Sequence, residues 1–363
     1  MKYWLLIPII LAAAFSPIAA KDSSAQDAPT EEPRHDFRYS FAAIEDATYY
    51  GNLTVPIPKT LNQILIEPSF SVRYLDRWTF SSSLVGAADS YTGTHSQLRV
   101  KETYAGLSAG DFDFTVGRRM VRWGTGYAFS AAGVLDPPRI PTDPTDRLNL
   151  NEGRDMIKAD WVHGPHAFSL AWSTAALAPA QANLRDTTAF RYNVLVRGFD
   201  TALIAGDDRG GDPFGALTFT RVLGQAWEVH GEAVWREEAA ILLGAKYTIS
   251  GVTFIGEFYT SPNIPYYSYM GVSPLAGRQH YAFLTAGKAR LRERPGWKEW
   301  SLSGSVVANL DDHSHTPVFE ASRWFGNHFS SYVHVEIPRG SKTSQFGSAP
   351  YSAATSVGVR FQL

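Results

Sequence analysis

Residues 227–235 read WEVHGEAVW, and this stretch decides the fold class. Its odd positions hold aromatic or small apolar residues, whereas the even positions include Glu228, His230 and Glu232. Such alternation predicts a β-strand with one apolar face and one polar face. The same pattern recurs along nearly the whole chain, for instance over 166–175, 298–308, 328–337 and 354–363. The sequence therefore predicts an all-β protein of about 18 strands, with 16 as the alternative count.

The predicted connections between strands alternate in length. One set is short, as at 75–76, 198 and 250, and the other set contains long segments such as 123–154 and 261–278. Short turns at one rim and long loops at the other are typical of outer-membrane barrels, and closed barrels from bacteria have an even number of strands. Both observations predict a closed antiparallel transmembrane β-barrel whose third external loop is the longest.

The chemistry of the two faces supports a membrane setting. An apolar face on every strand needs a partner, and in a bilayer the lipid covers it while the polar face lines the lumen. A closed barrel also pairs every backbone group, as lipid requires. The mean hydropathy of −0.17 is low enough for a barrel of this kind.

The N-terminal residues have the pattern of an export signal. Lys2 precedes an apolar run and then small residues, which predicts a signal peptide over 1–20 and cleavage after Ala20, with Ala25 as second choice. An N-terminal helical anchor is the alternative. The polar segment 21–35 is expected to be a disordered lead-in, and 36–363 to form the barrel.

Composition excludes several other classes of protein. The net charge is −2 without a basic stripe, so nucleic acid is not an expected partner. There is no cysteine, hence no disulfide and no thiolate metal site. The chain contains no P-loop, dinucleotide-binding glycine motif or nucleophile elbow, so we expect neither an enzyme nor a cofactor.

In this layout the chain resembles a Gram-negative porin. The stretch LRVKETYAGL (98–107) followed by DFDFTVGRR (111–119) is similar to the strand pair that precedes the third loop of porins. The final residues TSVGVRFQL (355–363) are similar to the terminal strand of outer-membrane proteins, although these more often end on the aromatic residue itself. The resemblance implies residence in the outer membrane, contact with its lipid and passage of small polar solutes. Many porins are trimers, so it also implies a homotrimer as one assembly.

The resemblance gives the segment 123–154 a role, because the third loop of porins folds into the lumen and narrows it. This segment lies within RRMVRWGTGYAFSAAGVLDPPRIPTDPTDRLNLNEGRD (118–155), which is rich in proline, acids and arginines. A connection this long is usually functional. Whether it enters the lumen or stands above the rim is left open by the sequence.

Two groups of charged residues are candidates for the pore. A basic wall facing acids of the loop would form a constriction, since charges lining a pore select solutes; solvated wall charges are the alternative. The constriction set comprises Arg73, Arg99, Lys101, Arg119, Asp136, Asp143, Asp146 and Glu152. Strict alternation turns Arg118 outward, and a β-bulge is expected to turn Glu102 inward.

The second group is a lumen network of Glu228, His230, Glu232, Lys246 and Glu257. Carboxylates around a histidine can bind a metal or move protons. We favour a hydrogen-bonded network without metal, because neither a cysteine nor a close second histidine accompanies it. The segment 311–315 (DDHSH) is interpreted as a solvated turn, with a cation bridging surface lipid as the alternative.

These observations predict a passive outer-membrane pore for small polar solutes. Three alternatives remain open: a polysaccharide export channel, which a continuous basic track would favour; a barrel enzyme acting on lipids, which a Ser–His pair on the outer wall would favour; and a structural barrel with a plugged lumen.

Overall fold

The computed structural model describes residues 35–90, 95–137, 139–148, 150–174, 186–208, 213–236, 238–262, 279–289 and 299–363. The expected signal peptide and all of the lead-in except His35 lie outside these ranges. No helix within them is long and apolar enough to cross a membrane. The described barrel is the unit His35–Leu363.

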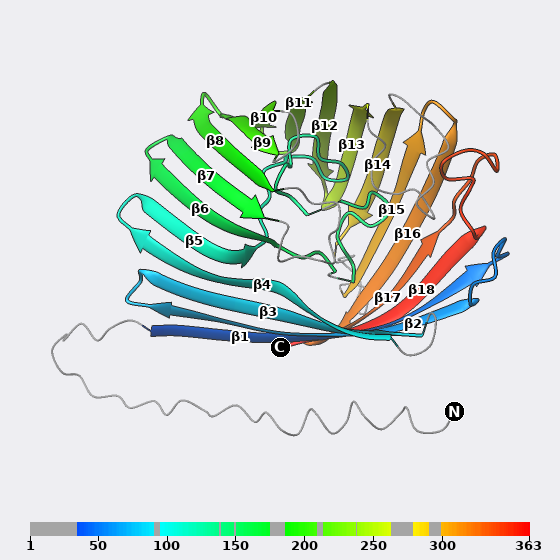
Figure 1. The fold of residues 1–363 in the computed structure, drawn as a ribbon. Coiled ribbons are helices and arrows are strands. Elements are labelled where there is room, and N and C mark those ends of the chain that lie inside the picture. The colour runs from blue at the N-terminus through cyan, green and yellow to red at the C-terminus, as the bar shows by residue number, and fades with distance from the viewer. Residues whose placement is uncertain are drawn as a thin grey trace. The chain divides into compact units, whose positions relative to one another are not determined.

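Within the described residues, eighteen antiparallel strands form one sheet that closes on itself (Figure 1). They are β1 (His35–Gly51), β2 (Thr60–Tyr74), β3 (Trp78–Asp89), β4 (His95–Ala109), β5 (Phe112–Arg119), β6 (Arg154–His163), β7 (His166–Thr174), β8 (Thr187–Val196), β9 (Phe199–Asp208), β10 (Pro213–Leu223), β11 (Trp227–Trp235), β12 (Ala239–Ile249), β13 (Val252–Ser261), β14 (Gln279–Lys288), β15 (Trp300–Asn309), β16 (Ser314–Phe325), β17 (Phe329–Glu336) and β18 (Ala353–Gln362).

The closure of the barrel joins the two ends of this unit. β1 pairs with β2 along one edge and with β18 along the other, so that Ala42 lies opposite Glu67 and also opposite Gln362. Each strand therefore has two neighbours, and no edge is left open to lipid. The prediction of a closed 18-stranded barrel is confirmed.

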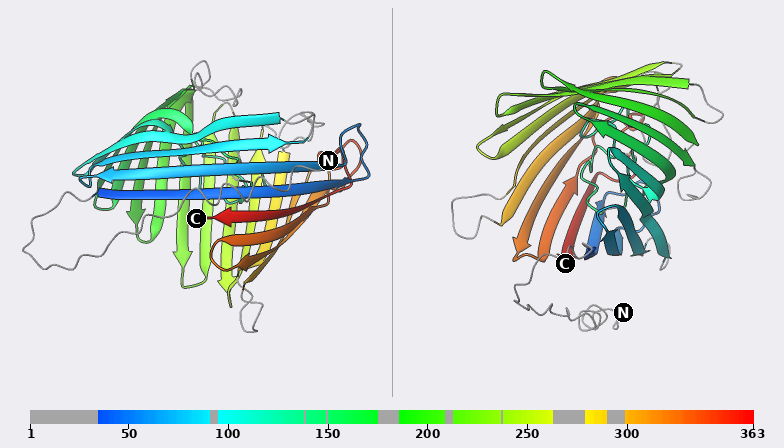
Figure 2. Two further views of the ribbon diagram at one scale, coloured as in Figure 1. Left: turned by 90° about the horizontal axis from the view of Figure 1, so that it is seen from below. Right: turned by 90° about the vertical axis from the view of Figure 1, so that its left-hand side faces the viewer.

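The alternating faces of each strand explain this closed form. Trp227 and Trp235 of β11 are 48% and 51% exposed on the outside, whereas His230 and Glu232 between them are 1% and 3% exposed. Apolar side chains thus cover the outer surface, where a bilayer supplies their partner. Figure 2 shows the strands crossing the wall obliquely, as closure of a barrel requires.

Short turns at one rim follow hairpin rules. In the turns Arg197-Gly198 and Ser250-Gly251 both residues have positive φ, as in the type I′ turns that match the strand twist. These are the positions where the sequence predicted short links.

A β-bulge interrupts β4 and explains the orientation of two charged residues. The β3–β4 register shifts between Ser83 and Leu84, so that Lys101 has no partner opposite it and Glu102 faces Ser83. An extra residue in one strand reverses the side on which later residues point. The expected inward turn of Glu102 is thereby confirmed.

Gly117 of β5 lies opposite β4, the strand that carries this bulge. Its backbone conformation and its close contacts require glycine at this position. It has φ of 124°, and a Cβ there would approach the carbonyl oxygen of Thr103 and lie 2.9 Å from Cα of Tyr104. We predict that Gly117→Ala destabilises the barrel by about 1–3 kcal/mol, the usual cost of a strained backbone. Urea unfolding followed by circular dichroism measures this change.

The matched control is Gly215→Ala, since a Cβ at Gly215 has no neighbour within 4 Å. Equal unfolding midpoints for the two variants would contradict the account of Gly117.

Candidate functional site

The connection between β5 and β6, residues 120–153, folds into the barrel; we call it the lumen loop. Figure 1 shows it running inside the ring of strands. Ala128, Ala132 and Leu135 of the loop are at most 1% exposed and belong to one apolar cluster with wall residues such as Leu242 and Phe283. The question that the sequence left open is thus answered: the loop enters the lumen.

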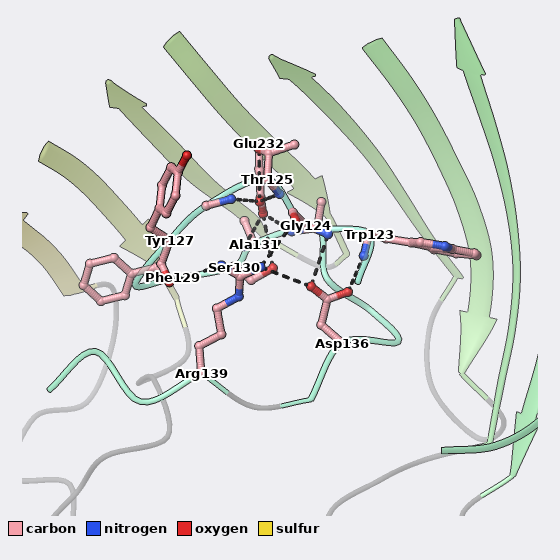
Figure 3. A network of polar contacts seen from close by, with 12 residues as sticks. Trp123, Gly124, Thr125, Tyr127, Phe129, Ser130, Ala131, Asp136, Arg139 and Glu232 are labelled. Carbon is pink, nitrogen blue, oxygen red and sulfur yellow. Dashed lines mark hydrogen bonds and ion pairs between the residues drawn. The ribbon is translucent and has the colours of Figure 1, made fainter. Parts of the chain in front are cut away.

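Glu232 on β11 makes the largest attachment of this loop (Figure 3). Its Oε1 accepts the backbone N–H groups of Thr125 and Gly126, the latter at 2.7 Å. Its Oε2 accepts those of Ala131 and Ala132 at 2.6 and 2.7 Å. Four N–H groups converging on one carboxylate make a concave anion site of backbone dipoles. The turn 125–132 is therefore wrapped around a side chain of the wall.

Glu257 on β13 makes the second attachment. It accepts the N–H groups of Tyr127, Ala128 and Phe129, the latter two at 2.8 and 3.3 Å. Nε2 of His230 lies 3.0 Å from Oε1 of Glu257, and both side chains are fully buried. The imidazole lies over Gly244, where a Cβ would overlap it. The histidine thus orients the carboxylate that binds the loop.

Tyr127 at the tip of the loop completes the group. Its hydroxyl donates to Glu228 at 2.8 Å and lies 3.1 Å from Nζ of Lys246, which is itself 3.7 Å from Glu228. Burial raises the pKa of this phenol, so that it remains a neutral donor. All five residues predicted as a lumen network therefore meet at the lumen loop. Among the described residues, no group of three or more acids or histidines is placed to hold a metal ion.

Three of the predicted constriction acids have another orientation from the one expected. Asp136 accepts the N–H of Trp123 at 2.6 Å and lies 3.5 Å from Arg139, which also donates to the carbonyls of Gly124 and Tyr127. Burial raises the pKa of the Asp136 carboxyl and also that of Asp143.

Asp143 and Asp146 cap turns further along the loop. Asp143 accepts the N–H of Arg147, and Asp146, with φ of 49°, accepts those of Leu150 and Asn151. The sequence analysis placed these acids opposite a basic wall, whereas the structure turns them towards the backbone of their own loop. Short acidic side chains in a proline-rich segment favour this local bonding.

The fourth acid, Glu152, does meet the wall. It lies 3.5 Å from Arg99 and 3.9 Å from Arg118, and Arg118 forms a two-pronged ion pair with Asp155 at 2.8 and 3.0 Å. Arg118 also donates to the carbonyl of Val100. These bonds lie where β5 leaves the wall, so the arginine links β4, β6 and the end of the lumen loop.

The remaining basic residues do not form one ladder. Lys101 is 4% exposed and pairs with Glu67 at 3.0 Å. Arg119 donates to Thr115 and lies over the ring of Tyr104. Arg73 is exposed at the end of β2 near a short turn. The structure thus places the four predicted basic residues in separate surroundings.

One contact of the lumen loop was missed by sequence reasoning. Arg147 reaches β1, where it bonds to Asp46 at 2.6 Å, and its guanidinium lies 4.9 Å from the ring centre of Tyr332 on β17. Tyr332 also donates to Asp46, which is fully buried. The loop is therefore fixed to opposite walls. An acid at an inward position was the one available signal, and nothing in the sequence pairs it with Arg147.

The segment 311–315 is held by bonds within itself and to two neighbouring segments. Asp312 accepts the N–H and hydroxyl of Ser314 and the N–H of Gln345, and Asp311 bonds to His280. This arrangement agrees with a turn rather than a cation site.

Comparison with known proteins identifies relatives of the fold. No family model matches the sequence, and no curated protein is detectably similar to it. Among solved structures, OccK5 (OpdH) of Pseudomonas aeruginosa is similar with a TM-score of 0.63 and 7% identity, over 90% of this chain and 98% of that one.

Two further solved structures agree. The outer-membrane protein opdK of Pseudomonas aeruginosa matches at a TM-score of 0.60 and 8% identity, over 90% and 98% of the two chains. OccAB3 of Acinetobacter baumannii matches at 0.60 and 7%, over 90% and 99%. At such identities the similarity concerns the fold, and this chain has the fold of an 18-stranded outer-membrane β-barrel.

Proposed function

We propose that the protein is an outer-membrane pore through which small polar solutes diffuse, and that the lumen loop narrows this pore. The observation that carries the proposal is the fixed position of the loop inside the barrel. Glu232 and Glu257 hold its first half to one wall, and Arg147 holds its second half to Asp46 on the other. A loop held at both sides gives a constant constriction rather than a swinging lid.

The lumen wall carries hydroxyl groups that suit polar solutes. Hydroxyl side chains such as Ser71, Ser81 and Ser303 occupy inward positions on β2, β3 and β15, in line with buried inward residues of the same strands. Hydroxyl groups replace the hydration of a passing solute without fixing its charge. This lining supports passage of small polar molecules.

The alternatives fit the geometry less well. An exporter of acidic polysaccharide needs a continuous basic track, but the lumen lysines Lys101, Lys158 and Lys246 each lie within 4 Å of a carboxylate. A lipid enzyme needs a Ser–His pair on the outer wall, whereas His230 and His334 face the lumen and bond to Glu257 and Glu320. The outward histidines His166 and His280 bond to Tyr192 and Asp311 instead of a serine. We retain the outer membrane and its lipid as surroundings, and a homotrimer remains a prediction.

Recordings from the protein in a planar bilayer test the pore directly. We expect discrete conductance steps with a steady open level, because the constriction is fixed. A purified, folded barrel that gives no conductance steps above baseline would contradict the proposal and favour a structural barrel with a plugged lumen.

Replacing the main anchor tests the role of the loop. Glu232→Gln exchanges one accepting oxygen for an amide that cannot accept two N–H groups, and each hydrogen bond to a charged group contributes about 1.5–3 kcal/mol. We expect a noisier and larger conductance, because Glu257 alone then holds the turn 125–132 to this wall. Single-channel recordings and urea midpoints measure both effects.

Glu320→Gln is the matched control, since Glu320 faces the lumen but bonds to His334 instead of the loop. If both variants conduct like the unmodified protein, the loop does not set the conductance.

Arg99 and Arg73 are expected to affect the ion selectivity of the pore to different extents. Arg99 is 35% exposed beside Glu152 at the loop, so Arg99→Gln should shift the reversal potential in a salt gradient towards cation preference. Arg73→Gln should shift it less, because Arg73 lies exposed near the short-turn rim, where ions screen it. Equal shifts in reversal potential for the two variants would show that the region of the lumen loop does not determine the ion selectivity.

A further inference from the structure

A second loop, residues 337–352 between β17 and β18, carries side chains that are unusually buried; we call it the mouth loop. Ser344, Gln345 and Phe346 are 2%, 3% and 0% exposed. Loops at a rim ordinarily present polar residues to water. The burial of these three residues indicates that something inside the barrel holds them.

The polar contacts of Gln345 fix the mouth loop to the wall. Its Oε1 accepts the hydroxyl of Tyr281 at 2.9 Å and the amide of Asn309 at 2.8 Å. Its N–H donates to Asp312 at 2.6 Å, and the N–H of Phe346 donates to Ser314 at 3.2 Å. Tyr281 and Asn309 are 0% and 1% exposed, so this amide satisfies groups that water does not reach.

The same tyrosine touches the lumen loop with its ring. Phe129, two residues after the tip residue Tyr127, has its ring centre 5.8 Å from that of Tyr281. Phe129 also stacks on Tyr259 at 5.0 Å with 11° between the planes. Phe346 belongs to the apolar cluster that includes all three rings. Tyr281 thus contacts the lumen loop through its ring and the mouth loop through its hydroxyl.

We propose that Gln345 and Phe346 of the mouth loop are positioning residues for the constriction, acting on the tip of the lumen loop through Tyr281. Glu232 and Glu257 hold this tip by its backbone, and the aromatic group holds it by the side chain of Phe129. Asn309 keeps Gln279 as a second acceptor at 3.2 Å when Gln345 is lost. The buried hydroxyl of Tyr281 loses its acceptor, and this favours another orientation of the Tyr281 ring. The tip then keeps its anchors but loses its single position.

The electrical part of the test rests on the proposed pore function. Single channels of Tyr281→Phe, Gln345→Ala and the double variant are compared with the unmodified protein; Tyr281→Phe keeps the ring and removes only the hydroxyl. We expect each single variant to lose the steady open level and switch between sublevels. Both substitutions remove the same hydrogen bond between Tyr281 and Gln345. The double variant should therefore switch between sublevels no more often than the single variant with the larger effect.

Thr343→Ala is the control, being an exposed position of the same loop. Steady conductance in both single variants, or additive effects in the double variant, would overturn the proposal.

A second measurement separates this proposal from the pore itself. The chain has no cysteine, so Ile140→Cys, at a 50% exposed position of the lumen loop, accepts one nitroxide label. Gln345→Ala should increase the mobility of this label, and Thr343→Ala should not. A mobile label in a barrel without conductance would defeat the pore and leave the positioning intact, whereas an unchanged label would defeat the positioning.

Discussion

The structure of the lumen depends on one requirement: a loop folded into a barrel must satisfy its backbone N–H groups. Seven of these groups, from Thr125 to Ala132, bond to two carboxylates of the wall, Glu232 and Glu257. An unsatisfied buried N–H costs about 1–3 kcal/mol, so an apolar wall could not hold this turn. Apart from the hydroxyls of Thr125 and Ser130, which donate to Glu232 at 3.3 and 3.4 Å, the carboxylates bind the turn through its backbone. Most positions of the turn can therefore hold small residues.

Small residues then become necessary for a second reason. A Cβ at Gly124 would approach the hydroxyl of Ser130 and lie 3.0 Å from Glu232, and a Cβ at Gly126 would lie 2.7 Å from Leu242. The loop backbone therefore packs directly against wall side chains. Its aromatic residues Trp123 and Phe129 lie in the apolar cluster. Polar attachment and apolar packing thus act on the same few residues and fix the turn in one conformation.

The sequence was sufficient to predict the barrel fold, because the strand period, the turn residues and the loop lengths are local properties of the chain. Residues 227–235 alone showed which side chains of β11 face inward, and that placed Glu228, His230 and Glu232 together. Register across the wall is also readable, as the bulge that turned Glu102 inward shows. Partners within a folded loop are different. Asp136 and Asp143 looked like pore-facing charges, but their distance to backbone groups depends on loop geometry that no residue pattern specifies. The same holds for Asp46 and Arg147, which lie about 100 residues apart.

The two-sided attachment of the lumen loop has a practical consequence for protein engineering. Positions such as Arg122, Ile140 and Leu150 are exposed, although the segments between them are bound to the wall. They form a set of sites on a rigid internal bridge, where side chains can be exchanged or chemical groups attached without disturbing the bonds that hold the bridge. A barrel without any cysteine of its own makes such sites individually addressable. The protein thus offers a barrel whose interior side chains can be changed one position at a time.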